Sequence, residues 1–65
     1  MCLSTVYDKK ADAEHALLKN VQNIRVDGRH LVFTDLMERE HEYEGALVSA
    51  DLVNGSVIID IGANP

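Results

Sequence analysis

The sequence is short of basic residues, aromatic residues and cysteine, and each shortage disfavours a class of protein. Six Lys and Arg residues stand against eleven Asp and Glu residues, so the formal net charge is −5. A protein that follows nucleic-acid phosphates needs a basic face, and so does one that binds an anionic membrane surface. A single cysteine excludes a disulfide within the chain and is typical of a reducing compartment.

Long apolar runs and catalytic motifs are also missing. The longest strictly apolar runs are two or three residues, whereas a helix that spans a bilayer needs roughly 18. The first residues lack the charged and apolar regions of a secretory signal. There is no G-x-S-x-G motif or phosphate-binding glycine loop, and Ser4, Thr5 and Ser49 have no identifiable general base. The sequence therefore predicts a cytoplasmic protein that is not an enzyme.

The chain is small for an independent fold. Its 65 residues predict a single domain over residues 1–65. Below roughly 70–80 residues, one core rarely supplies more than about 3–5 kcal/mol of stability. With no disulfide available, we expect a metal ion or self-association to add support.

Strand signals recur about every eight to ten residues. Alternating apolar and β-branched residues predict strands at 2–7, 13–21, 22–26, 30–36, 37–44, 46–53 and 56–61. Segment 13–21 is also compatible with a short helix, because it is rich in Ala, Glu, Leu and Lys. The dipeptides Asp27-Gly28 and Asn54-Gly55 predict tight hairpins. The pattern predicts an all-β fold, a small SH3-like barrel of six or seven short antiparallel strands.

A row of glutamates gives the cleanest pattern in the chain. The alternation predicts a strand over 37–44 with one solvated acidic face, formed by Glu38, Glu40, Glu42 and Glu44. His41 lies on the other face, where a packing role is favoured over a metal-ligand role. His15 and His30 are isolated and are expected at the surface. No two-ligand spacing such as H-x-x-x-H or C-x-x-C is present.

Cys2 is the most reactive group, and its position adds to its chemistry. Its thiolate is a soft ligand for nickel, copper(I) or zinc. The sulfur and the backbone nitrogen of Cys2 can close a five-membered chelate ring, and the amine of a retained Met1 can close a second. Nitrogen and sulfur donors in one plane suit Ni(II), and two chains together would supply four of them. An incidental cysteine, a redox thiol and a Cys2–His41 dyad are the alternatives.

Several stretches of the sequence together resemble a known family. The chain opens Met1-Cys2 and continues through small and β-branched residues into Val6-Tyr7; Glu40-His41 falls within 36–45, and the last strand contains Val57-Ile58-Ile59. In these features it resembles the CooT-type nickel-binding proteins. The resemblance implies an SH3-like homodimer that binds Ni(II) through Cys2 and helps deliver nickel to carbon monoxide dehydrogenase. Cys2 is the one residue that maps onto the metal site.

The leading interpretation is therefore a nickel metallochaperone or nickel store that holds Ni(II) at Cys2, at a homodimer interface. Carbon monoxide dehydrogenase or its maturation factors are the candidate partners, and neither nucleic acid nor a membrane is expected. The alternative is an SH3-like module that binds RNA or protein without a metal. Stacking on RNA bases would have to use Tyr7, Phe33 and Tyr43.

Overall fold

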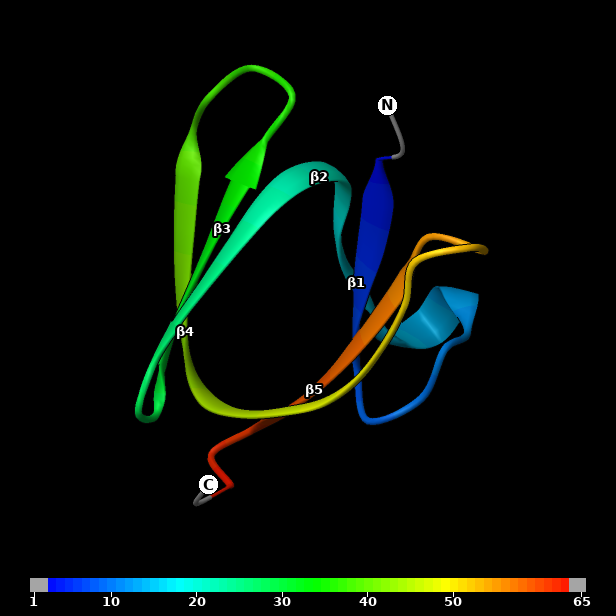
Figure 1. The fold of residues 1–65 in the computed structure, drawn as a ribbon. Helices are drawn as coiled ribbons and strands as arrows, with labels where there is room; N and C mark the ends of the chain where they lie inside the picture. The colour runs from blue at the N-terminus through cyan, green and yellow to red at the C-terminus, as the bar shows by residue number, and fades with distance from the viewer. Residues whose placement is uncertain (1–2, 64–65) are drawn as a thin grey trace.

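The computed structural model describes residues 3–63, which form five strands around a small core (Figure 1). The strands are β1 (Ser4–Asp8), β2 (Ala16–Asp27), β3 (His30–Asp35), β4 (Glu40–Asp51) and β5 (Ser56–Ile61), and a short 3-10 helix, η1 (Ala13–His15), precedes β2. They close a barrel in the order β1-β2-β3-β4-β5, with β5 paired back to β1. The predicted all-β barrel is thus confirmed.

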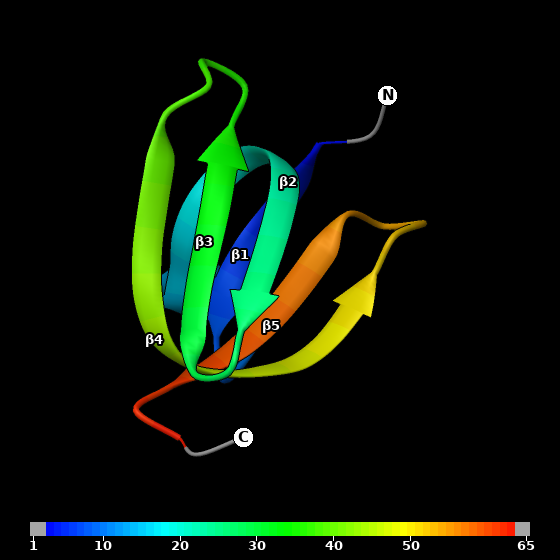
Figure 2. The same ribbon diagram turned by 60° about the vertical axis from the view of Figure 1, so that its left-hand side comes forward.

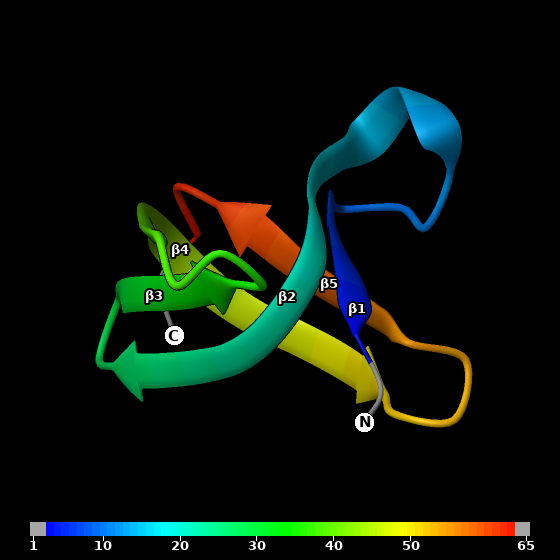
Figure 3. The ribbon, with the colours of Figure 1, turned by 90° about the horizontal axis from the view of Figure 1, so that it is seen from above.

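The predicted count of six or seven short strands was wrong, because two pairs of predicted strands are continuous. The predicted strands 13–21 and 22–26 fall largely within β2, and 37–44 and 46–53 fall largely within β4. Each long strand bends and changes partner along its length. β2 pairs with β1 up to Val21 and with β3 from there on, while β4 passes from β3 to β5 at Gly45 (Figures 2 and 3).

The two bends have different local causes. At Asn20, φ is +59°, and β2 carries one extra residue between the pairs Ser4–Val21 and Val6–Leu18. Asparagine tolerates this left-handed conformation better than most residues, so it forms a bulge rather than a strand end. At Gly45 a Cβ would overlap the carbonyl oxygen of Asp60, so only glycine allows β4 and β5 to approach this closely.

The prediction that all strands pair antiparallel was also wrong, because β1 and β5 are parallel. Thr5 pairs with Ser56 and Asp8 with Ile59. The cause is the number of strands: when five consecutive strands alternate in direction, the first and the fifth run the same way. Closing the ring therefore makes this one junction parallel.

Both predicted hairpins are present, although their turns differ from the prediction. Asp27 pairs with His30, so the first turn consists of Gly28 and Arg29, with φ of +60° at Gly28. The β4–β5 turn covers the four residues 52–55 and is closed by the Gly55 amide, which donates to the Asp51 carbonyl over 2.8 Å. Segment 13–21 combines both alternatives, because η1 gives way to β2 at Ala16.

The core is small and comes from four of the five strands. Phe33 is fully buried, and its ring centroid lies 5.8 Å from that of the half-buried Tyr43 on β4. The clustered buried residues are Val6, Val21, Leu31, Phe33, Val57 and Ile59. Burying each such side chain contributes about 1.5–3 kcal/mol before entropy is subtracted, which leaves little reserve for a domain of this size.

Among residues 3–63 there is no helix with the length and apolar character that crossing a membrane requires.

Candidate functional site

The first described residues of β1 are held tightly in the barrel. Ser4 and Val6 are buried, and Ser4 stands opposite Val21 on β2. The Thr5 amide donates to the Gly55 carbonyl over 2.8 Å. A Cβ at Gly55 would lie 3.0 Å from the Leu3 carbonyl oxygen, so this glycine lets the β4–β5 turn lie against the start of β1. Cys2, the predicted metal ligand, lies outside the described residues, and β1 begins at Ser4, two residues after it.

A shallow hollow of about 240 Å³ lies beside this strand start. It is lined by residues from β1, from the bend of β2 and from the β4–β5 turn, namely Ser4, Val21, Gln22, Asn23, Ile24 and Leu52. None of these side chains is charged. The hollow can therefore accept an apolar or hydrogen-bonding group, and among residues 3–63 its lining contributes no carboxylate, imidazole or thiol.

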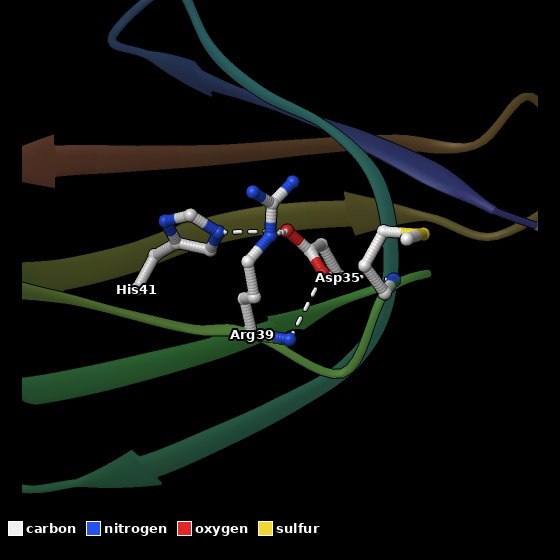
Figure 4. A network of polar contacts seen from close by, with 4 residues as sticks. Asp35, Arg39 and His41 are labelled. Carbon is white, nitrogen blue, oxygen red and sulfur yellow. Dashed lines mark hydrogen bonds and ion pairs between the residues drawn. The ribbon is translucent and has the colours of Figure 1, made fainter.

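His41 is half-buried and forms a hydrogen bond through one of its two ring nitrogens. It stands opposite Phe33 and so faces the inside of the barrel. Its Nε2 atom lies 2.9 Å from Oδ2 of Asp35 (Figure 4). Since an ionised carboxylate only accepts hydrogen bonds, this nitrogen carries a hydrogen and has no lone pair for a metal ion.

Asp35 is the centre of this network, and the sequence interpretation gave it no role. Its Oδ1 atom accepts hydrogen bonds from the backbone amides of Met37 and Arg39, at 2.9 and 3.0 Å. Its Oδ2 atom accepts from Nε of Arg39 at 3.3 Å in addition to His41. The hydrogen bond from His41, followed by that from the Arg39 amide, lowers the pKa of Asp35 from 3.8 to about 2. A signal was present in the sequence, because Asp35 shares the inward face of Leu31 and Phe33.

The hydrogen bonds of Asp35 explain why the exposed glutamate row is shorter than predicted. Glu40, Glu42 and Glu44 are exposed and alternate with the half-buried His41 and Tyr43, as predicted. Residues 37–39 belong to the β3–β4 loop rather than to the strand, because Asp35 draws their amides into a tight connection. Glu38 adopts φ of +64° there and is outside the row.

The other two histidines lie near the surface, each beside a carboxylate. Nδ1 of His15 lies 2.6 Å from Asp12, whose Oδ1 atom also accepts the His15 amide and caps η1. Nε2 of His30 lies 3.2 Å from Glu42 on the neighbouring strand. Within residues 3–63, no group of three or more His, Cys, Asp or Glu side chains is placed to hold a metal ion.

Comparison with protein families decides what kind of protein carries this barrel. The family model described as CO dehydrogenase accessory protein CooT matches residues 1–60. The chain belongs to the CooT family. The match covers most of the sequence and includes Cys2, the histidine–aspartate network and the hollow. Among curated proteins, none matches the chain.

Membership of the CooT family confirms two predictions. The family resemblance seen in the sequence was correct, and the chain is an accessory protein of CO dehydrogenase rather than an enzyme.

Proposed function

We propose that this CooT protein is a cytoplasmic metallochaperone or nickel store that supplies Ni(II) for the maturation of CO dehydrogenase. The observation that carries the proposal is the place of the only cysteine, at position 2 and within the region matched by the CO dehydrogenase accessory family. The Cys2 backbone nitrogen and the amine of a retained Met1 can both close five-membered chelate rings with this thiolate as a donor set.

The donor chemistry suits Ni(II). The Cys2 thiolate and its own nitrogen form one five-membered chelate ring, and nitrogen–sulfur donors in a plane are the arrangement that Ni(II) favours. Binding requires the thiol and a nitrogen to lose protons, so the affinity should rise with pH. The ion is cargo in this proposal, held by a few exchangeable donors that a client protein can replace.

The barrel supports this site by limiting where the thiol can go. Two residues of fully extended chain span at most about 7 Å, so Cys2 stays close to Ser4, which is buried in β1. The anchored strand therefore presents the donors near the hollow and the β4–β5 turn. The five strands, with two long strands bent between partners, support an SH3-like description of this mount.

One chain supplies too few donors for a closed site, so we propose that two chains share the ion. Two nitrogens and two sulfurs from a homodimer would complete a planar set around one Ni(II). The small core also favours a dimer, because a barrel with so few buried residues gains stability from a partner subunit.

The test is a calorimetric titration with Ni(II) of the parent protein, Cys2→Ser and His30→Gln. Replacing the thiolate should weaken binding by at least about 100-fold, since loss of a chelating ligand removes several kcal/mol. His30→Gln is the matched control, because it removes a surface nitrogen donor far from Cys2 in the sequence, and its affinity should equal that of the parent. Equal affinity of Cys2→Ser and the parent would place the nickel site elsewhere.

A further inference from the structure

The β4–β5 turn holds two neighbouring residues that can react with each other, Asn54 and Gly55. Of the four asparagines in the chain, Asn54 is the one that glycine follows. Because glycine has no Cβ, its backbone nitrogen is uncrowded and can approach the side-chain carbonyl carbon of the preceding asparagine, which closes a five-membered ring. The other three asparagines precede valine, isoleucine and proline; they are Asn20, Asn23 and Asn64. Branched side chains crowd this approach, and proline has no N–H to lose.

The surroundings of Asn54 also favour a reaction with water. The turn covers residues 52–55, in which Asn54 is exposed and Gly55 is half-buried. At Gly55, φ is +72°, a conformation that glycine adopts without strain. Asn20 and Asn23 instead lie within the long strand β2. Asn54 therefore combines a suitable neighbour with a place outside the strands.

Asp51 holds both of the groups that would react. Its backbone carbonyl accepts the Gly55 amide over 2.8 Å, and its Oδ2 atom accepts Nδ2 of Asn54 over 2.7 Å. Its Oδ1 atom also accepts the backbone amide of Asn54 at 3.1 Å. Ring closure requires the Gly55 nitrogen to give up its hydrogen and Nδ2 of Asn54 to leave, so these hydrogen bonds have to break first. Hydrogen bonds to an ionised carboxylate are stronger than neutral ones, so the Asp51 side chain is the main restraint.

We propose that Asn54 is a site of slow covalent modification, which converts it through a cyclic imide to aspartate and isoaspartate, and that Asp51 controls the rate. In the first step the lone pair of the Gly55 nitrogen forms a bond to Cγ of Asn54. The bond from Cγ to Nδ2 breaks, and the hydrogen of the Gly55 amide leaves with Nδ2 as ammonia. Water then adds to one of the two ring carbonyl carbons, the bond from that carbon to the nitrogen breaks, and the nitrogen regains a hydrogen. Opening at Cγ gives aspartate, and opening at the main-chain carbonyl carbon gives isoaspartate.

The isoaspartate product would alter the contact between the β4–β5 turn and β1. In this product the main chain runs through Cβ and Cγ, so the turn gains one main-chain atom just before Gly55. There is little room for it, because even a Cβ on Gly55 would lie 3.0 Å from the Leu3 carbonyl oxygen. The Gly55 carbonyl also accepts the Thr5 amide over 2.8 Å. Isoaspartate therefore displaces Gly55 and weakens this hydrogen bond, whereas aspartate changes only the charge.

The experiment incubates the full chain without metal at mildly alkaline pH and follows each asparagine by peptide mapping with mass spectrometry. In the parent, Asn54 should be lost while Asn20 and Asn23 persist. Asp51→Ala removes the carboxylate that holds the Asn54 side chain. We expect this variant to lose Asn54 about tenfold faster, the effect of one charge-assisted hydrogen bond on a rate. Asp27→Ala is the matched control: it removes an exposed aspartate beside the other hairpin turn and should leave the rate at Asn54 unchanged.

Two further measurements isolate the role of the folded turn. In urea the parent and Asp51→Ala should lose Asn54 at the same rate, because Asp51 restrains the reacting groups only when the turn is formed. Asp51 is exposed, so Asp51→Ala keeps its fold in buffer, which circular dichroism verifies. Hydrogen exchange measured by NMR then compares the Thr5 amide in the purified isoaspartate form and in Asn54→Asp. This amide should exchange about tenfold faster in the isoaspartate form and as in the parent in Asn54→Asp.

Three results would contradict the proposal. Loss of Asn20 or Asn23 as fast as Asn54 overturns Asn54 as the modification site. Equal rates at Asn54 in the folded parent and the folded Asp51→Ala variant overturn the control by Asp51. Parent-like exchange of the Thr5 amide in the isoaspartate form overturns the effect on β1. None of these readouts involves nickel, so their results are independent of the proposed function.

Discussion

The two connections that flank β4 are each closed by an aspartate, and they differ in burial. In the β3–β4 loop, Asp35 accepts the amides of Met37 and Arg39, and its side chain is 10% exposed. In the β4–β5 turn, Asp51 accepts the amides of Val53 and Asn54, both at 3.1 Å, and it is exposed to solvent. The hydrogen-bonding scheme is nearly the same, so the surroundings decide what each carboxylate contributes.

Asp35 and Asp51 differ in what can replace their hydrogen bonds once the carboxylate has been removed. When the Asp51 acceptor is removed, water reaches the freed amides. Around Asp35 the inward-facing His41 would lose its acceptor in a partly buried place, and unsatisfied polar groups in such places are costly. One end of β4 is therefore held by a network that includes a core-facing side chain, and the other by a local turn whose groups are close to water.

Replacing Asp35 should give the largest effect. Asp35→Ala removes an acceptor shared by four hydrogen bonds, and we expect the midpoint of thermal unfolding to fall by about 10 °C or more. Circular dichroism at neutral pH gives the midpoint. His41→Gln is the control. Its side-chain amide can still donate to Asp35, so the unfolding midpoint of this variant should fall less. A midpoint within a few degrees of the parent would show that the network is not structural.

The loss of stability in acid should also depend on Asp35. We expect this effect to be intermediate in size between those of Asp35→Ala and Asp51→Ala. The pKa of Asp35 is lowered from 3.8 to about 2, so the folded state holds the ionised form more strongly than the unfolded chain does. This contribution is complete above about pH 4 and is lost as the pH falls toward 2. Unfolding measured across this range should show a shallower acid loss for Asp35→Asn than for the parent. Equal slopes would contradict the assignment.

Replacing Asp51 should give the smallest effect. The hydrogen bond from the Asn54 side chain, at 2.7 Å, and that from the Asn54 amide lower the pKa of Asp51, but all these groups are near water. Asp51→Ala should lower the unfolding midpoint by less than about 5 °C. A loss as large as that of Asp35→Ala would mean that burial is not what distinguishes the two turns.

The sequence predicted what depends on local pattern. The alternation from Glu40 to Glu44 follows from a period of two, and the two hairpins follow from the dipeptides Asp27-Gly28 and Asn54-Gly55. Asn20 and Gly45 are of residue types that can end or bend a strand, but whether a strand continues through such residues depends on its partners. The histidine–aspartate network joins a strand end to a strand start, so it arises only when the loop between them closes.

The features of the candidate site also divide into those that the local sequence predicts and those that depend on the closed barrel. Cys2 could be chosen from chemistry and position, because a soft ligand beside backbone nitrogens is visible in the sequence. The exposure of Val26, at 49%, could not, since Val26 shares its face with Ile24 as a core residue would. It follows from the divergence of β2 and β4 after their bends, a property of the closed barrel.

Because β1 pairs with β5, the first strand to be synthesised has to wait for the last strand before its pairing is complete. β1 is among the first segments made, yet one of its two neighbours is the last strand, and their contacts join residues about 50 positions apart, as in Thr5 with Ser56. Such distant pairing forms late in folding. β1 thus leaves the ribosome well before the strand that completes its pairing is made. The barrel closes only when the last strand has been synthesised, so the fold forms after translation rather than strand by strand during it.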